Sequence, residues 1–218
     1  MNIYAGRTTA FGLTLVILLL SVAANASAQT SRAATAASYL QRGQVWLERG
    51  ETERALADFN LAVASDPTAA AAWRARGIAR RNQGDLAGAL ADLDQSLELD
   101  PRSARGRLQR AATLYLQGKL DEAEADLDAA VKLDSRFAEA YNDRGVLRHL
   151  RGEVTAAVRD YDAALGLNPR FAKAWMNRGI ARLEQGRRAD AERDFAECLR
   201  LNPKLKTAVE LLLEKGEQ

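Results

Sequence analysis

Residues 70–103 read AAAWRARGIARRNQGDLAGALADLDQSLELDPRS. Two stretches of helix-forming composition lie at 70–83 and 86–99. Gly84 separates them, and Pro101 follows the second. Glycine takes the left-handed backbone geometry that a tight turn between helices needs, and proline cannot continue the helix before it. The stretch therefore predicts two helices joined by a short turn.

The same pattern recurs every 34 residues, and a period of this size is typical of repeat architectures. The arginine column is Arg42, Arg76, Arg110, Arg144 and Arg178, and the aspartate column is Asp58, Asp92, Asp126, Asp160 and Asp194. The turn glycines are Gly50, Gly84, Gly118, Gly152 and Gly186, and an alanine column is Ala55, Ala89, Ala123, Ala157 and Ala191. Pro67, Pro101, Pro169 and Pro203 close four units, and Ser135 closes the third. Five helix pairs are therefore expected.

Small and large residues complement each other between the two helices of each unit. The first helix carries Gly43, Gly77, Ala111, Gly145 or Gly179, and the second carries Phe59, Leu93, Leu127, Tyr161 or Phe195. Small residues let two helices approach closely, and the large side chains fill the space opposite them. One repeat cannot bury its apolar face alone, so neighbouring repeats are expected to stack.

These columns resemble the tetratricopeptide repeat family over residues 36–205. The resemblance rests on the early Trp or Tyr, the small residue after it, the later Ala, the Phe or Tyr and the closing Pro. The third unit departs from the pattern, with Arg107 for the aromatic residue, Ala111 for the glycine and Ser135 for the proline. The resemblance implies an all-α, right-handed α-solenoid of five helix pairs, at 36–69, 70–103, 104–137, 138–171 and 172–203. An apolar stripe at helical spacing predicts a C-terminal capping helix at 204–218.

The first 28 residues have the pattern of a secretory signal peptide. Arg7 precedes an apolar core, and Ala26-Ser27-Ala28 forms an A-x-A cleavage site. We therefore expect cleavage after Ala28, a short linker at 29–35, and export from a bacterial cell to the periplasm. The alternative is an uncleaved membrane anchor, in which weakly polar flanks lengthen the apolar core toward the length of a membrane span.

The composition argues against several classes of function. Lys and Arg number 31 against 29 Asp and Glu, so the net charge of +2 gives no field for binding nucleic acid. Cys198 is the one cysteine and His149 the one histidine, which leaves little for metal chemistry. The chain has no phosphate-binding glycine loop, HExxH or CxxC motif. We therefore expect no enzyme, no metal site and no cofactor.

The resemblance implies that the first helices line a concave groove that binds a peptide or a partner protein. Residues three or four apart share one face of each first helix. The candidate groove residues are Arg74, Arg81, Arg105, Tyr115, Asn142, His149, Lys173 and Met176. Apolar side chains mix there with a basic cluster of Arg74, Arg81 and Arg105. This lining predicts a partner segment with hydrophobic anchors and some acidic residues.

The arginine and aspartate columns have another explanation. A charge present in all five units is expected to maintain the repeat. We therefore predict that these arginines pair with aspartates of their own or adjacent units and fix the orientation of the helices.

The expected function is a non-catalytic adaptor or scaffold that holds another protein. The alternative is a membrane-tethered structural protein that self-associates through the stripe of Leu205, Val209, Leu212 and Leu213. The sequence leaves the oligomeric state open.

Overall fold

The computed structural model describes the backbone of residues 5–215 and the side chains of residues 27–214. The described chain is helical throughout, with short turns and no strand. It divides into two compact units, Met1–Leu99 and Asp100–Gln218.

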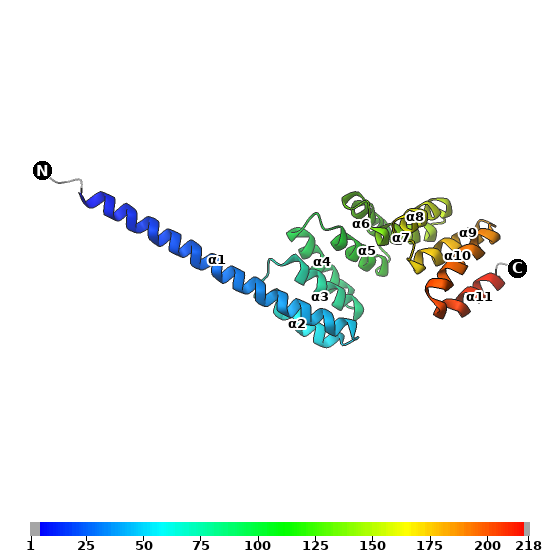
Figure 1. Ribbon diagram of the computed structural model, residues 1–218, viewed down its shortest axis with the longest axis horizontal. Helices are drawn as coiled ribbons and strands as arrows, with labels where there is room; N and C mark the ends of the chain where they lie inside the picture. The colour runs from blue at the N-terminus through cyan, green and yellow to red at the C-terminus, as the bar shows by residue number, and fades with distance from the viewer. Residues whose placement is uncertain (1–4, 216–218) are drawn as a thin grey trace. The chain divides into compact units, whose positions relative to one another are not determined.

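The described residues of the first unit form four helices in chain order (Figure 1). They are α1 (Ala5–Glu48), α2 (Thr52–Ser65), α3 (Ala70–Asn82) and α4 (Leu86–Leu99). Each helix packs against the next one along the chain, and α1 also contacts α3. The contact between α1 and α3 places the first helices of successive repeats side by side.

The second unit continues the same arrangement through three further helix pairs (Figure 1). Its helices are α5 (Ala104–Leu116), α6 (Leu120–Leu133), α7 (Ala138–Leu150), α8 (Val154–Leu167), α9 (Ala172–Glu184) and α10 (Arg188–Leu201), followed by the 3-10 turn η1 (Pro203–Leu205) and α11 (Lys206–Lys215). Again each helix contacts the next, and α7 also contacts α9.

The glycine at the centre of each repeat makes the turn between its two helices. Gly84 has a φ angle of 86° and Gly152 one of 78°, a left-handed conformation that other residues rarely adopt. No neighbouring atom lies within 4 Å of where a Cβ would stand at either position. Backbone conformation therefore explains this glycine column.

Close helix packing explains the other glycine column. A Cβ placed on Gly145 would lie 2.6 Å from Cε1 of Tyr161, and one on Gly179 would lie 2.6 Å from Cε1 of Phe195. Both rings are almost fully buried. The first helix of these repeats can approach the second only because the facing residue has no side chain.

The C-terminal helix covers the end of the second unit. Val209 on α11 is 3% exposed and packs in one cluster with Ala191 and Phe195 of α10. Leu212 and Leu213 join the same cluster. Three residues of the apolar stripe of this tail, Val209, Leu212 and Leu213, are therefore folded back on the last repeat.

The expected all-α architecture of helix pairs with a C-terminal capping helix is confirmed. Residues 29–35, expected as a linker, belong to α1 instead. Most of the predicted signal peptide falls outside the residues whose side chains are described. Within the described part of the chain, no helix is both long enough and apolar enough to cross a membrane.

Candidate functional site

The structure brings the arginine and aspartate columns together in every repeat. Each arginine on a first helix donates two hydrogen bonds, from Nε and Nη2, to the aspartate 16 residues later. The distances lie between 2.6 and 3.0 Å for Arg42–Asp58, Arg76–Asp92, Arg110–Asp126, Arg144–Asp160 and Arg178–Asp194. The aspartates are all buried, with at most 4% of their surface exposed. Two parallel charge-assisted bonds fix both the distance and the orientation of the paired helices.

Each buried aspartate also accepts a hydrogen bond from a second side chain, and the sequence analysis did not predict this donor. In three repeats it is the arginine one turn after the column arginine: Arg80 on Asp92, Arg148 on Asp160 and Arg182 on Asp194, at 2.8 to 2.9 Å. In the first repeat it is the side chain of Trp46, which hydrogen-bonds to Asp58. The signal in the sequence was an arginine that recurs at positions 80, 148 and 182, in three of the five repeats.

The third repeat obtains its second donor from a different position. Leu114 stands where the second, fourth and fifth repeats have the additional arginine. Arg107 supplies the bond instead, with its Nη1 2.9 Å from Oδ1 of Asp126. The departure of Arg107 from the aromatic column therefore preserves the number of donors around the buried carboxylate.

The column arginines also tie successive repeats together. Nη1 of Arg144 lies 2.8 Å from Oδ1 of Asp128 on the preceding repeat, and Nη1 of Arg178 lies 2.5 Å from Oδ1 of Asp162. In the first unit, Arg76 donates in the same direction to Asn60. One guanidinium thus bridges the second helices of two neighbouring repeats.

An aromatic ring lies beneath most of these guanidinium groups. Arg42, Arg76, Arg144 and Arg178 stand 4.6 to 5.4 Å from the ring centroids of Tyr39, Trp73, Tyr141 and Trp175. This distance is within the range of cation–π attraction. The fold therefore holds arginine repeatedly between a carboxylate and an aromatic face.

The arrangement also favours the charged state of the aspartate. The hydrogen bond from Arg42 holds the pKa of the Asp58 carboxyl below its usual value, against the opposing effect of burial. The arginines and aspartates of the two columns pair with residues of this same chain. Their geometry is that of structural pairs between helices.

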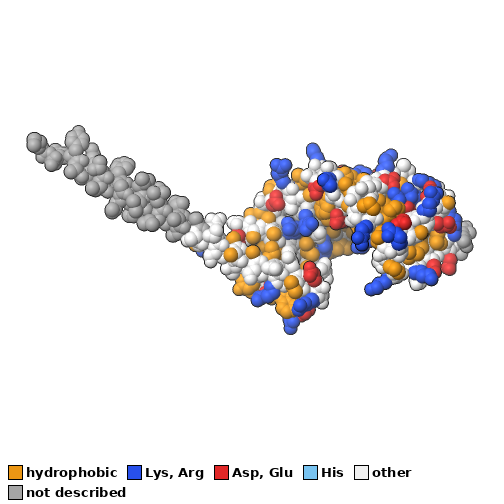
Figure 2. All heavy atoms as spheres, viewed as in Figure 1, with side chains coloured by type: hydrophobic (Ala, Val, Ile, Leu, Met, Phe, Trp, Pro, Cys, Tyr) orange, Lys and Arg blue, Asp and Glu red, His pale blue; other side chains and the backbone are white. Residues whose placement is uncertain are grey.

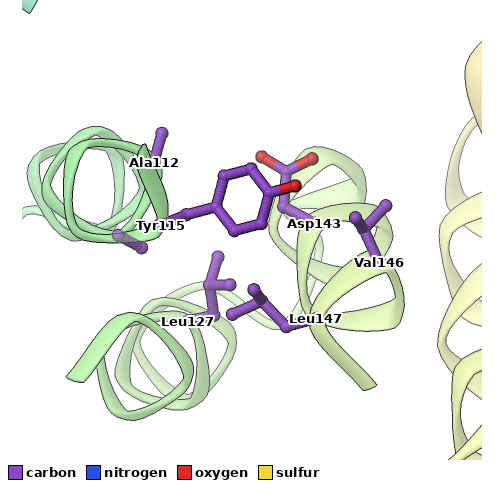
Figure 3. Close-up of a pocket in the computed structure, with 7 residues that line it drawn as sticks. Ala112, Tyr115, Leu127, Asp143, Val146 and Leu147 are labelled. Carbon is purple, nitrogen blue, oxygen red and sulfur yellow. The ribbon is translucent and has the colours of Figure 1, made fainter. Parts of the chain in front are cut away.

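A cavity of about 180 Å³ opens between the first helices of the third and fourth repeats. Ala112 and Tyr115 of α5 form one wall, and Asp143 and Val146 of α7 form the other (Figure 3). Leu127 from α6 lies between the two helices, and Ala111 and Leu147 complete the lining. Tyr115 is 40% exposed, so a large aromatic ring borders the cavity while still in contact with solvent.

The third repeat, like the second, has a leucine where the other three repeats have a ring on the second helix. In the first, fourth and fifth repeats an aromatic ring on the second helix reaches the glycine of the first helix. The third repeat has Leu127 and Ala111 at these positions, and both line the cavity. A leucine side chain fills less space than a ring. The sequence showed Ala111 as an exception, but whether a cavity forms beside it depends on how α5, α6 and α7 meet.

The predicted basic cluster is divided between the two units. Arg74 and Arg81 lie half-buried on α3 of the first unit, and Arg105 lies exposed on α5 of the second. Figure 2 shows acidic and basic side chains interspersed with hydrophobic ones on the face in view. The cluster of three arginines thus stays a prediction.

Of the predicted groove residues, Tyr115 is the one that lines the cavity. Asn142 is buried, where it accepts a hydrogen bond from Asn177 and donates one to Asp143. It was expected on an open face, but the packing of α7 against α9 covers it. Sequence reasoning missed Asp143 and Leu147, because the helical period alone does not show which face the neighbouring repeat leaves open.

The remaining predicted residues have different surroundings. Nε2 of His149 lies 2.8 Å from Oε2 of Glu184, so this histidine already has a partner on α9. Lys173 is exposed on α9. Met176 packs with Phe195 and Val209 in the C-terminal cluster, where the capping helix contributes to its burial. Met176 is thus half-buried against an apolar cluster.

The comparison with known families decides how this architecture is classified. The family model described as tetratricopeptide repeat matches residues 40–104, 74–136, 108–165 and 151–206. The chain belongs to the tetratricopeptide repeat family. Proteins of this family mediate protein–protein interactions and are generally non-catalytic. No curated protein matches the chain.

Solved tetratricopeptide repeat structures resemble the fold. PilF of Pseudomonas aeruginosa is 20% identical, with a TM-score of 0.74, over 79% of this chain and 78% of that one. A thermophilic protein of Thermus thermophilus is 22% identical, with a TM-score of 0.70, over 83% and 98%. YrrB, described as having an unusual peptide-binding site, is 20% identical, with a TM-score of 0.59, over 82% and 90%. At these identities the likeness concerns the fold.

Proposed function

We propose that this tetratricopeptide repeat protein is a non-catalytic adaptor of the bacterial periplasm that binds a peptide segment of a partner protein along its first helices. The cavity beside Tyr115 carries this proposal. It is mostly apolar, it lies between two first helices, and an exposed aromatic ring borders it. Exposed aromatic residues beside apolar pockets are frequent anchors of protein interfaces.

Exposed apolar side chains on the two first helices that line the cavity support a protein ligand. Leu116 and Leu150 occupy the same repeat position at the ends of α5 and α7, and they are 55% and 59% exposed. They are the two most exposed large hydrophobic side chains in the described part of the chain. Exposed large apolar side chains on the helices that form a pocket favour association with another protein.

The repeat family and one solved relative agree with this proposal. Tetratricopeptide repeat proteins bind protein or peptide partners. YrrB is described as having a peptide-binding site, which is a property of that protein. We extend peptide binding to this chain because of its own cavity.

Export rests on the sequence pattern of the first 28 residues. We propose that cleavage after Ala28 releases the protein into the periplasm. Mass spectrometry of the protein purified from its native envelope fraction tests this step. A chain beginning at Gln29 supports the proposal, and a chain that retains residues 1–28 in the membrane fraction contradicts it.

Partner binding is tested with the full chain carrying a C-terminal affinity tag, used to capture proteins from an envelope extract. The variant is Tyr115→Ala, and the matched control is Leu167→Ala, because Leu167 on α8 is 39% exposed but lies outside the cavity. We expect a captured partner that Tyr115→Ala loses and Leu167→Ala retains, with unchanged circular dichroism. Equal capture by both variants contradicts a site at this cavity.

A second variant tests the predicted basic cluster. Changing Arg74, Arg81 and Arg105 to Glu reverses its charge. A partner segment with acidic residues is expected to dissociate from this variant. If the triple variant stays folded and still holds the partner, the cluster has no part in binding.

A further inference from the structure

Two positions on the first helix of a repeat pack against the second helix of the repeat before it. In the first unit, Ala72 and Ala79 of α3 belong to apolar clusters with residues of α2. In the second unit, Ala174 and Ala181 of α9 belong to apolar clusters with residues of α8. These four alanines are at most 1% exposed. Both positions are therefore part of the contact between successive repeats.

The first repeat presents the same two positions to solvent. Ser38 and Val45 on α1 stand 34 residues before Ala72 and Ala79. Ser38 is exposed, and Val45 is 40% exposed. The outer face of a terminal repeat is polar where it meets water, so an exposed valine there favours a covering partner. We call Ser38, Arg42 and Val45 the N-terminal face.

Arg42 adds a hydrogen-bond donor to this face. Its Nε and Nη2 donate to Asp58, as in the other repeats. In the fourth repeat, Nη1 of Arg144 also donates to Asp128 on the second helix of the preceding repeat. Nη1 of Arg42 has no such partner among the described residues, and 57% of this side chain is exposed, against 14% for Arg144. Nη1 is thus available to a carboxylate from outside.

The contact between α8 and α9 shows what kind of helix covers such a face. Tyr161 and Leu165 of α8 belong to the clusters that bury the two alanines of α9. Asp162, also on α8, accepts a hydrogen bond from Nη1 of Arg178 at 2.5 Å. The covering element is therefore a helix with an apolar stripe and one carboxylate beside that stripe.

We propose that the N-terminal face binds an amphipathic helix of a partner protein, which carries a carboxylate beside its apolar stripe. The stripe packs on Val45 and over the small side chain of Ser38, and the carboxylate accepts a charge-assisted hydrogen bond from Nη1 of Arg42. This surface uses the first repeat alone and none of the residues that line the cavity. It therefore goes beyond the proposed function.

The last repeat of a second copy of the chain does not have this chemistry. Ala196 stands at the repeat position of Asp128 and Asp162, so α10 offers no carboxylate there. The capping helix α11 also packs against α10. The proposed occupant is therefore a helix of a different protein.

A synthetic peptide with the sequence of α8, residues 154–167, is the probe. An isolated helix of this length is marginal in water, so a hydrocarbon cross-link replaces Arg159 and Gly166, which are both exposed on α8. Two further peptides carry Asp162→Asn or Asp160→Asn. These two changes are chemically the same, but Asp160 pairs with Arg144 of its own repeat and not with the following one. Fluorescence anisotropy measures binding of each labelled peptide to the full chain.

The protein variant is Val45→Glu, which places a negative charge on the N-terminal face. Its matched control is Leu211→Glu, the same kind of change at a residue of α11 that is 53% exposed. Tyr115→Ala tests whether the peptide enters the cavity instead. Thermal midpoints verify that all variants are folded.

We expect the native chain, Leu211→Glu and Tyr115→Ala to bind the probe equally well, and Val45→Glu to lose it. The Asp162→Asn peptide is expected to bind about tenfold more weakly than the probe, in line with the loss of one hydrogen bond between charged groups. The Asp160→Asn peptide is expected to bind as tightly as the probe.

Three results would overturn the inference. The first is no binding by the folded native chain, or equal binding by Val45→Glu. The second is loss of binding by Tyr115→Ala, which would place the peptide in the cavity and leave the proposed adaptor function standing. The third is a native chain that self-associates in sedimentation and becomes monomeric on Val45→Glu, which would make the occupant a second copy.

Discussion

Arg107 donates to Asp126 across 2.9 Å, from the repeat position at which the other four repeats carry an aromatic ring. The aspartate is 3% exposed and also accepts two hydrogen bonds from Arg110. The third repeat thus lacks both the aromatic residue, in whose place Arg107 stands, and the additional arginine, in whose place Leu114 stands. One substitution offsets the other in the hydrogen bonding of the buried carboxylate.

This relationship predicts a compensating pair of substitutions. Arg107→Tyr restores the aromatic residue but removes one charged hydrogen bond, so we expect it to lower the free energy of unfolding by about 2 kcal/mol. Adding Leu114→Arg is expected to recover most of that loss, because the new arginine takes the position of Arg80, Arg148 and Arg182 in their repeats. Urea denaturation of the two single variants and the double variant measures the coupling. Additive losses would contradict the compensation.

The buried and the exposed aspartates of α8 are expected to differ in their effect on stability. Asp160 accepts from Arg144 and Arg148 and is 4% exposed. Asp160→Asn leaves two arginines facing an uncharged group, so we expect a loss of about 3 kcal/mol in the free energy of unfolding.

Asp162 is the matched control, because it lies two residues away and pairs with Arg178 at the surface. For Asp162→Asn we expect a loss below about 1 kcal/mol. The two free energies are compared by chemical denaturation. Losses of equal size would show that burial does not determine the contribution of these pairs.

Two glycines in the fourth repeat are expected to respond oppositely to alanine. A Cβ on Gly145 would lie 2.6 Å from the ring of Tyr161, so Gly145→Ala is expected to cost about 1–3 kcal/mol through overpacking. Gly166, near the end of α8, has no atom within 4 Å of that position, so Gly166→Ala is expected to stabilise by about 0.5–1 kcal/mol. Thermal unfolding followed by circular dichroism measures both. A stabilised Gly145→Ala protein would refute the packing explanation.

The Arg42–Asp58 pair predicts how stability depends on pH. The pKa of Asp58 is lowered in the folded protein by the hydrogen bond from Arg42, whereas an unfolded aspartate has a pKa of about 3.9. The pair therefore stabilises the fold above the unfolded pKa, and this contribution is lost as the pH falls through the folded pKa.

Thermal midpoints between pH 7 and pH 2 check this expectation. The native chain is expected to be more stable than Asp58→Asn at pH 7, and the difference is expected to shrink below about pH 4 as the native carboxyl is protonated. A difference of constant size across this range would show that the pair does not act through its charge.

The helix pairs could be predicted because their signals are local and repeated. Gly84 at a turn and Pro101 after a helix act on the backbone beside them, and the 34-residue period showed the same signals in each repeat. The spacing also predicted that the arginine and aspartate columns would meet, since both lie at fixed places in every helix pair. Arg144 and Asp160 illustrate this regularity.

The open surface could not be predicted in the same way. The helical period placed Asn142 and Met176 on an outward face, but the contacts of α7 with α9 bury one, and Met176 packs in the cluster that the capping helix completes. Asp143 is one residue from Asn142 and lines the cavity. Which of two adjacent positions stays accessible depends on the crossing of neighbouring helices, which no local pattern encodes.

The sequence by itself determined the repeat, its helix pairs and its family, because turn glycines, helix-ending prolines and small residues act through short-range backbone conformation and packing. Only the tertiary structure decided that the irregular third repeat leaves a cavity and that Tyr115 and Asp143 border it. The physical reason is that a cavity is a shortfall in volume where three helices meet. Its position is fixed by Ala111 and Leu127 together with the placement of α5, α6 and α7.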